Sequence, residues 1–433
     1  MGCFRVKIEC AKDSWLFVVG EVTIEVLNGS IEIFGADYKT GSVISVPKYR
    51  SAPVRVLENA LLNIDFEDGY IAESKESLIP REWRELGEKL LNRGNGYTVM
   101  TIGNVDTGKT GLLTFLANYL LKSGKKVAVI DADVGQSDIG PPTTIGLGLV
   151  EKPIIHLSEI PLQDAFFVGS VTPAGVLNRS IIGTYRMVQR AKELGVDVIL
   201  IDTTGWVGDR WGRELKIGKI SVVQPDLIVF IEKDAGELSY LEKSLIGYSG
   251  EIYKVPAAPR LRVRNWEERR ELRKMMYLKE FTDAREVVID LNDVNVSYGF
   301  LGTGRSPTEE TLNLLMELLG DIQDIYIEES WDSILIITEN KPAPKVLEEL
   351  KRRLNKREIF AVTPDNVRNL LISLHDRAGK FLGLGIILDF NPREKKLLVF
   401  TRARLDAVTS IQFGHMKLSI DGEELEKFAP WFI

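Results

Sequence analysis

The residues best suited to chemistry in this chain are Gly103-Asn104-Val105-Asp106-Thr107-Gly108-Lys109-Thr110, a glycine followed by four residues and then Gly-Lys-Thr. They stand between an apolar run at 97–102, which predicts a strand, and a helical pattern at 109–123. The glycines allow a tight turn whose N–H groups, with the helix N-terminus, face the phosphates of a nucleotide. Lys109 would then reach the β- and γ-phosphates, and Thr110 would ligate Mg²⁺. The pattern therefore predicts a phosphate-binding loop, or P-loop.

Two carboxylates and an amide follow the next apolar run, at 126–131, in the segment Asp131-Ala132-Asp133-Val134-Gly135-Gln136. They would emerge at the carboxyl end of the sheet beside the P-loop, where open α/β folds bind ligands. One carboxylate could hold the Mg²⁺ shell, and another could take a proton from an attacking hydroxyl. For Asp131 a structural role, capping a loop or orienting Lys109, is as well supported as a chemical one. For Asp133 the chemical role is favoured.

A third predicted strand, at 198–202, ends in Asp202-Thr203-Thr204-Gly205-Trp206. Asp202 follows four apolar residues, the usual position of the carboxylate that binds the metal and its water. Trp206 has two interpretations. It is either a core residue, the commoner fate of tryptophan, or a platform at the mouth of the site on which a base stacks.

A local excess of basic residues lies downstream in an otherwise acidic chain. It comprises Arg260, Arg262, Arg264, Arg269, Arg270, Arg273 and Lys274. Such a run is usually a solvated face. Near a phosphoryl-transfer site, however, arginine is suited to stabilise charge on the transferred group.

Apolar runs alternating with helices predict an α/β fold whose central domain, at 97–305, has a mostly parallel sheet. Besides the strands already named, we expect one at 227–232 and helices at 180–194, 237–247 and 266–281.

Both flanks of the central domain have a different pattern. Period-two alternation and an Asn28-Gly29 turn predict an N-terminal all-β domain of hairpins at 1–78, with strands at 22–27 and 30–35. A linker helix is expected within 79–96. The remainder, 306–433, predicts an α+β domain. It has helices at 344–355 and 363–375 and strands at 383–389 and 396–401.

Composition limits the classes of function. The formal net charge of −7 argues against a protein that coats nucleic acid with its whole surface, although a local basic patch is compatible with it. Three histidines and the pair Cys3 and Cys10 show no zinc or disulfide spacing, so any metal should arrive with the nucleotide. Without an apolar run of about 18 residues or a signal-like start, we expect a cytoplasmic protein with no membrane partner.

These segments together resemble the Clp/Grc family of polynucleotide 5′-hydroxyl kinases, which act in RNA processing. The resemblance rests on the P-loop and on the segments 131–143, 171–173 with Asn178, and 202–206. It also rests on Arg264 and Arg269 with their five-residue offset. It implies transfer of the γ-phosphate of ATP, or of another NTP, to the 5′-hydroxyl end of RNA or DNA. Mg²⁺ or another divalent cation would assist. Single-stranded or duplex-end RNA and RNA-processing proteins are the implied partners.

The resemblance also implies roles for particular residues. Asp133 would be the general base and, with Thr110 and Asp202, a metal ligand. Arg264 and Arg269 would form a lid over the phosphates and act in catalysis with Lys109. The residues implied to hold the acceptor strand are Gln136, Thr172 in a clasp, Asn178, and Trp206 under a terminal base. Those implied to contact the nucleotide are Gly103, Asn104, Val105, Asp106, Thr107, Gly108, Lys109, Thr110, Gly111 and, in the N-terminal domain, Glu32.

Two other functions compete with the kinase. A P-loop GTPase should carry Asn-Lys-x-Asp after a later strand to read guanine, but here the sequence is Glu232-Lys233-Asp234-Ala235. A catalytically weak, ATP-binding scaffold of an RNA-processing complex would lack catalytic residues, yet every expected residue type is present.

Overall fold

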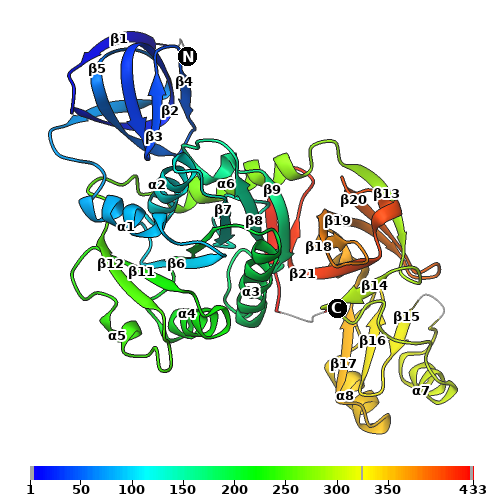
Figure 1. Ribbon diagram of the computed structural model, residues 1–433. Coiled ribbons are helices and arrows are strands. Elements are labelled where there is room, and N and C mark those ends of the chain that lie inside the picture. Colours follow the sequence, from blue (N-terminus) through cyan, green and yellow to red (C-terminus); the bar gives the residue numbers. More distant parts are fainter. Residues whose placement is uncertain (1–3, 323–324, 430–432) are drawn as a thin grey trace. The chain divides into compact units, whose positions relative to one another are not determined.

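The computed structural model of the chain describes residues 4–322, 325–429 and 433, and Figure 1 labels its elements. It divides into two compact units. The first comprises Met1–Gly140, Thr144–Phe166 and Leu177–Leu272, and the second comprises Pro141–Thr143, Phe167–Val176 and Arg273–Ile433. The four-part division at 78, 96 and 305 remains a prediction.

The first unit begins with a closed antiparallel sheet. Its strands are β1 (Phe4–Cys10), β2 (Trp15–Ile33), β3 (Ala36–Lys39), β4 (Val43–Val46) and β5 (Ser51–Ser74). The order is β1-β5-β2-β3, with β4 also paired to β2. The sheet closes because β2 and β5 pair twice, with Trp15 opposite both Arg55 and Ser74. Alternate residues of β2 and β5 fill the interior, so an all-β domain is present as predicted.

The prediction of a hairpin turn at Asn28-Gly29 is wrong, because β2 runs through this pair without reversing. The register against β5 shifts there, and a Cβ on Gly29 would lie 2.3 Å from the Asn59 carbonyl oxygen. The pair therefore forms a β-bulge, which needs a positive-φ glycine just as a tight turn does. The hairpin turn is Phe34-Gly35, with φ of 45° and 80°, and it joins Ile33 to Ala36.

The central sheet supplies the edge at which the predicted site lies. Its strands are β6 (Tyr97–Gly103), β7 (Val127–Ala132), β8 (Thr144–Val150), β9 (Leu162–Phe167), β10 (Val198–Thr203), β11 (Leu227–Glu232) and β12 (Glu251–Pro256). The order is β12-β11-β6-β10-β7-β8-β9. From β12 to β7 neighbouring strands are parallel, and β8 is antiparallel to β7. The carboxyl ends of β6, β10 and β7 therefore meet at one edge, as predicted.

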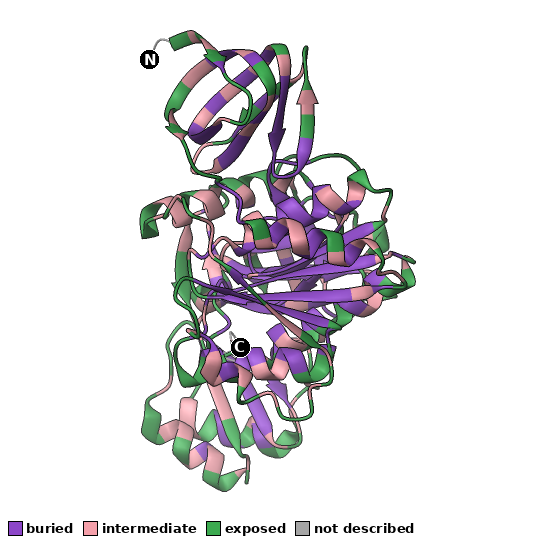
Figure 2. Cartoon of the chain, turned by 60° about the vertical axis from the view of Figure 1, so that its left-hand side comes forward, coloured by how far each residue is buried: buried purple, intermediate pink, exposed green. Residues whose placement is uncertain are grey.

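Helices cover both faces of this sheet, and Figure 2 shows its strands buried. The helices of the first unit are α1 (Arg81–Leu91), α2 (Lys109–Lys122), α3 (Leu177–Glu193), α4 (Arg210–Val223) and α5 (Ser239–Glu242), with the 3₁₀ turn η1 (Leu157–Glu159). The residues of α6 (Trp266–Glu280) belong partly to the first unit and partly to the second. The helix predicted at 237–247 is wrong beyond the four residues of α5, since Ile246 is 96% exposed and offers no buried face. Sequence reasoning missed α4, although Asp209 caps it by accepting from Trp211 N and Gly212 N.

The second unit contains two sheets. The larger has strands β13 (Arg285–Asp290), β14 (Asn295–Ser297), β18 (Leu370–His375), β19 (Phe381–Asn391), β20 (Lys396–Thr401), β21 (Ser410–Leu418) and β22 (Glu424–Lys427). The smaller consists of β15 (Tyr326–Glu329), β16 (Ser333–Ile337) and β17 (Glu358–Val362), and α7 (Glu309–Leu319) and α8 (Pro344–Arg353) belong to the same part. The remaining pieces are α9 (Pro364–Val367) and the turn η2 (Leu405–Ala407). The predicted C-terminal α+β class is confirmed. β13 and β14, which precede residue 306, also pair within the larger sheet.

The helix predicted at 363–375 is wrong. Only α9 is helical, and Asn369 with φ of 64° ends that geometry before β18. β18 lies between β19 and β21 and is buried at all six positions. An apolar run buried on both faces of a sheet has no period-two pattern, so its sequence cannot be told from that of a buried helix.

Two further predictions concern composition. Cys10 is buried with a free thiol, whereas Cys3 lies outside the described residues. Of the helices that the structure describes, none has the length and apolar content needed to cross a membrane.

The bulge makes a prediction about stability. Gly29→Ala should destabilise the protein by about 2–4 kcal/mol, because it adds both positive-φ strain and a clash with the Asn59 carbonyl. Gly41 is a matched control, since its φ is 91° but no atom lies within 4 Å of a Cβ there. Gly41→Ala should cost about 1 kcal/mol, the strain alone. Urea unfolding of both variants measures the difference, and equal losses would contradict the bulge.

Candidate nucleotide and phosphoryl-transfer site

The P-loop joins β6 to α2 and is held by its own backbone. Gly108 is the N-cap of α2 with φ of 90°, a conformation that favours glycine. The Lys109 ammonium donates to the Asn104 carbonyl at 2.7 Å, and the Thr107 hydroxyl donates to the same oxygen at 3.0 Å. These contacts hold the lysine inside the curve of the loop, at the N-terminus of the helix.

Asp202 at the end of β10 lies against the first turn of α2. Thr110 Oγ1 donates to Asp202 Oδ2 at 2.7 Å. The other oxygen, Oδ1, is buried with no hydrogen-bond partner among the described residues. Burial raises the pKa of Asp202 to about 6, although the Lys109 ammonium and the Thr110 bond act in the opposite direction.

The donor set around Thr110 fits a hard divalent cation. The described residues contain no group of three His, Cys, Asp or Glu side chains that could hold a metal alone. The Thr110 hydroxyl and the unpartnered Asp202 oxygen are oxygen ligands, which Mg²⁺ takes in small number together with phosphates and water. The residues therefore suit a metal that is shared with a nucleotide.

Asp131 holds the loop that follows β7. It lies opposite Asp202 in the β7–β10 register. Its Oδ1 accepts from Asp133 N at 3.0 Å, and its Oδ2 accepts from Asp138 N and from Ile139 N at 3.2 Å. Of the two roles left open for Asp131, this geometry favours the structural one.

Asp133 is held differently from Asp131. It is half-buried, and among the described residues only its Oδ1 accepts hydrogen bonds, from Gly135 N and Gln136 N at 3.2 Å each. The Gln136 amide donates to the Gly135 carbonyl at 2.6 Å. One carboxylate oxygen of Asp133 is thus left for another partner while the first fixes the side chain.

The two predicted lid arginines lie beside the P-loop. Arg269 donates to Asp106 Oδ2 at 3.2 Å and to the Arg264 carbonyl at 3.1 Å. Arg264 has no acceptor within hydrogen-bond distance among the described residues. Burial and the nearby Arg50 guanidinium lower its pKa to about 10. A desolvated guanidinium without a partner is suited to an anionic ligand.

Much of the remaining basic run is engaged elsewhere. Arg262 pairs with Glu268 at 2.7 Å. In the second unit Arg273 and Lys274 pair with Glu424 and Glu423. For these residues the interpretation as an ordinary charged surface holds.

Comparisons with known proteins agree with this geometry. Residues 103–283 match the family model described as mRNA cleavage and polyadenylation factor CLP1 P-loop. A polyribonucleotide 5′-hydroxyl-kinase of Thermococcus kodakarensis is 34% identical over 80% of this chain and 95% of the relative. One of Pyrococcus furiosus is 33% identical, with the same coverage of both chains.

The chain belongs to the polyribonucleotide 5′-hydroxyl-kinase family. The Clp1p chain of a solved Clp1p–Pcf11p complex has the same fold, with a TM-score of 0.65, 15% identity, and 96% and 98% of the two chains covered. The predicted resemblance, the fold class and the nucleotide-binding P-loop are confirmed.

In this family member, N-terminal residues bind the P-loop domain directly. The Phe34 carbonyl accepts from Asn118 Nδ2 of α2 at 2.9 Å. The Phe34 ring also lies close to Gly111 of α2, where a Cβ would be 3.4 Å from the ring. Glu32, predicted to contact the nucleotide, is buried, and both its oxygens accept from Arg84 of α1. Its contact with a base remains a prediction.

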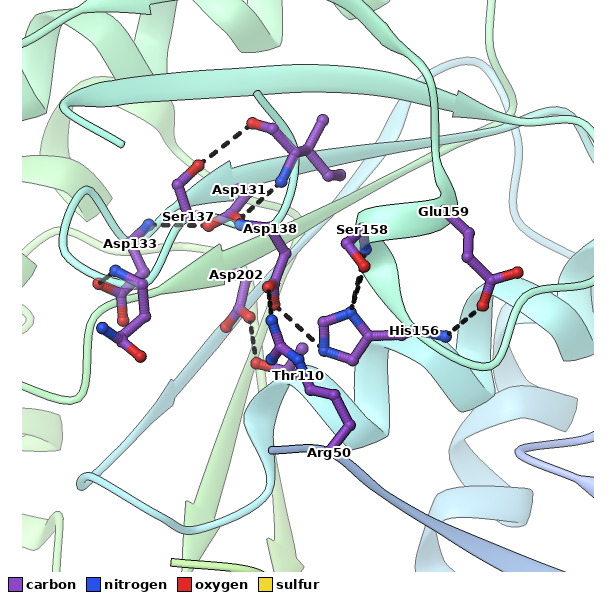
Figure 3. Close-up of polar contacts among 12 residues, drawn as sticks. Arg50, Thr110, Asp131, Asp133, Ser137, Asp138, His156, Ser158, Glu159 and Asp202 are labelled. Atoms are coloured by element: carbon purple, nitrogen blue, oxygen red, sulfur yellow. Dashed lines mark hydrogen bonds and ion pairs between the residues drawn. The ribbon is translucent and has the colours of Figure 1, made fainter. Parts of the chain in front are cut away.

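A second N-terminal contact reaches the loop after β7. Arg50 pairs with Asp138, which also lies 3.5 Å from His156 Nε2 (Figure 3). His156 Nδ1 accepts from Ser158 N at 3.1 Å. Burial lowers the pKa of His156 to about 3, so the ring is neutral at pH 7. Burial opposes the charge of Asp138, but Arg50 and His156 hold the pKa of Asp138 below its usual value. Sequence reasoning missed this network, for which no motif exists.

The other predicted acceptor residues are distributed between the two units. Trp206 is half-buried in the first unit, and its Nε1 donates to Asp209 Oδ2 at 2.8 Å. Asn178 is exposed on the first turn of α3. Thr172 is exposed in the second unit, where its hydroxyl accepts from Ala174 N at 3.3 Å. Their roles toward an acceptor remain predictions.

Two lysines of α4, Lys216 and Lys219, are fully buried close to the carboxylates, and sequence reasoning missed them. Lys216 Nζ donates to Thr203 Oγ1 at 2.9 Å and to the Thr204 carbonyl, just after Asp202. Lys219 Nζ donates to the Ala132 carbonyl at 3.2 Å, just before Asp133. Burial lowers both pKa values, that of Lys219 to about 8, while the Asp133 and Asp131 charges act to raise it.

The burial of Lys219 predicts that this lysine lowers the stability of the folded protein and raises the reaction rate. Its folded-state pKa of about 8 lies below the ordinary 10.5, so charging it in the folded protein costs about 3 kcal/mol at pH 7. Lys219→Met should therefore be at least as stable as the parent at pH 7. Its rate should fall, because the cation next to Asp133 is lost.

The sign of the pH dependence follows from the same shift. Between pH 8 and 10.5 the unfolded state binds more protons at Lys219, so the parent gains stability relative to Lys219→Met as pH rises. Urea unfolding at pH 7 and 9.5 measures this, with exposed Lys243→Met as the control that should show no such gain. A stability difference that does not change with pH would show that the buried ammonium carries no cost.

Proposed function

We propose that this chain transfers the γ-phosphate of ATP to the 5′-hydroxyl end of RNA. The observation that carries the proposal is that groups suited to a phosphate donor and a group suited to a hydroxyl acceptor lie at the same edge of the sheet. Lys109 and Thr110 suit the phosphates of a donor, and Asp133 has one carboxylate oxygen fixed and one left for an acceptor. The relatives named polyribonucleotide 5′-hydroxyl-kinase support the choice of acceptor.

The chain's own groups account for each change in bonding. The 5′-oxygen forms a bond to the γ-phosphorus as the bond from that phosphorus to the β–γ bridging oxygen breaks, and ADP leaves. Asp133 accepts the proton of the 5′-hydroxyl. Lys109, Arg264 and Arg269 stabilise the charge on the transferred group.

A divalent cation, Mg²⁺ or a similar ion, completes this proposal. Thr110, Asp202 and Asp133 would hold it, and it would neutralise charge on the β- and γ-phosphates. ATP is the proposed donor among the NTPs, and RNA is the proposed acceptor, with DNA as a further substrate. We also propose RNA-processing proteins as partners and a cytoplasmic location.

The GTPase alternative finds little support at the position where guanine would be read. Glu232 is buried, and its two oxygens accept from Gly236 N and Leu238 N at 3.0 and 2.8 Å. The carboxylate is thus occupied in closing its own loop. The scaffold alternative shares the nucleotide site with the kinase, and only turnover separates the two.

Label transfer from γ-labelled ATP tests the function. The protein, Mg²⁺ and short single strands with either a 5′-hydroxyl or a 5′-phosphate should give label on the 5′-hydroxyl strand alone. Lys109→Ala should abolish the transfer and leave the melting temperature near that of the parent, because it removes charge stabilisation at the phosphate cradle. ATP binding without transfer to any strand would favour the scaffold.

Asp133 and Asp131 provide a matched pair for the proposed base. Asp133→Asn should lower kcat at least a hundredfold with little change in ATP affinity or melting temperature, since it removes a proton acceptor but keeps the shape. Asp131→Asn should lower the melting temperature, because it replaces one of the oxygens that hold three backbone N–H groups. Kinetics beside thermal unfolding measure both. Equal losses of ATP affinity and kcat in Asp133→Asn would make it chiefly a metal ligand.

A further inference from the structure

An exposed surface of aromatic and basic side chains adjoins Trp206. We call it the α4 surface, and its residues are Arg210, Trp211, Arg213 and, from α5, Tyr240. Trp211 is 51% exposed, although tryptophan is costly to leave in water. The Arg210 guanidinium lies 4.8 Å from the Trp211 ring, and that of Arg213 lies 4.0 Å from the Tyr240 ring.

One carboxylate joins this surface to Trp206. Asp209 Oδ2 accepts from the Trp206 indole at 2.8 Å, and Asp209 Oδ1 accepts from Trp211 N at 2.9 Å. Tyr240 donates its hydroxyl to the Val207 carbonyl at 2.6 Å, which ties α5 to the same loop. The aromatic rings thus belong to one hydrogen-bonded segment that continues outward from the end of β10.

The helix also comes close to the Trp206 backbone. A Cβ on Gly212 would lie 2.8 Å from the Trp206 carbonyl oxygen. Only glycine permits this approach, so the position of Trp211 is fixed relative to Trp206 by the backbone as well as by Asp209.

Hydrogen bonds from Gly212 N and Trp206 Nε1 and, to a lesser extent, the charge of Arg210 lower the pKa of Asp209, so one carboxylate lies near the two arginines of the α4 surface. Among the described residues neither Arg210 nor Arg213 forms an ion pair, whereas Arg262 and Arg269 do. Two guanidinium groups that form no ion pair within the described part of the chain lie beside aromatic rings, and this combination is complementary to a polyanion with flat bases.

We propose that the α4 surface binds the nucleotides that follow the 5′-terminal one in a single-stranded acceptor. A base stacks on Trp211, and Arg210 and Arg213 contact the phosphates. The inference rests on the proposed kinase function and adds to it that affinity depends on the length of the single strand. It requires no sequence preference, because every base offers a face for stacking.

The test compares a short acceptor with a long one. The acceptors are a nucleoside 3′-monophosphate, which supplies only a terminal base, and a ten-nucleotide single strand with a 5′-hydroxyl. In the parent the longer acceptor should have the lower KM. Trp211→Ala should raise the KM ratio of the long acceptor to the short one about tenfold or more, and Trp211→Phe should restore most of the loss.

A matched control exists in the second unit. Trp331 is 78% exposed with the Arg357 guanidinium 5.6 Å from its ring, so it resembles Trp211 in exposure and neighbour. Trp331→Ala should leave the KM ratio unchanged. The double substitution Arg210→Gln and Arg213→Gln should make the slope of log KM against log salt concentration less steep for the long acceptor. The decrease should correspond to the loss of about one to two phosphate contacts.

The outcomes separate the two claims. If the parent transfers label and Trp211→Ala leaves the KM ratio unchanged, the proposal for the α4 surface is overturned and the kinase proposal stands. An equal rise of the KM values of both acceptors would have the same meaning. If no acceptor is labelled, the kinase proposal fails. In that case, fluorescence anisotropy of a labelled ten-nucleotide strand tests the α4 surface separately, because Trp211→Ala should still weaken the binding of this strand. Unchanged binding would point to a protein on this surface and overturn the proposal.

Discussion

The site depends on balancing several carboxylates that the parallel sheet places side by side. Asp131 and Asp202 are register partners on β7 and β10, and both are buried. Burial and repulsion by neighbouring carboxylates raise the pKa of both carboxyls, and the Lys109 ammonium opposes this shift at Asp202. Lys109 approaches from the P-loop, and Lys216 and Lys219 approach from α4. The lysines near the carboxylates thus come from two different helices, α2 and α4.

This arrangement assigns different tasks to chemically identical groups. Asp131 accepts backbone N–H hydrogen bonds with both oxygens and so holds the loop after β7. Asp202 accepts from the Thr110 hydroxyl, and its other oxygen has no hydrogen-bond partner in the described part of the chain. Asp133 is fixed through one oxygen only. Environment, and not residue type, therefore separates a scaffold, a candidate metal ligand and a candidate base.

A residue from the N-terminal part of the first unit also helps to hold the loop after β7. Arg50 and His156 hold Asp138, whose backbone N–H is in turn held by Asp131. A side chain of the connection between β4 and β5 is thereby linked through Asp138 and Asp131 to the loop that carries Asp133. Such networks stabilise one geometry when every member is satisfied, as most are here.

The sequence by itself determined the P-loop and the strands that lead into the site, and it singled out Lys109, Thr110, Asp133 and Asp202 as candidates, because each of these inferences depends on local spacing. Tertiary structure alone decided the rest. Whether the run at 370–375 became a helix or a strand depended on the neighbours β19 and β21, and whether Asn28-Gly29 became a turn or a bulge depended on β5. The cations Lys216 and Lys219 and the contact from Arg50 come from residues distant in sequence, brought to the site only by folding, so no local pattern could reveal them.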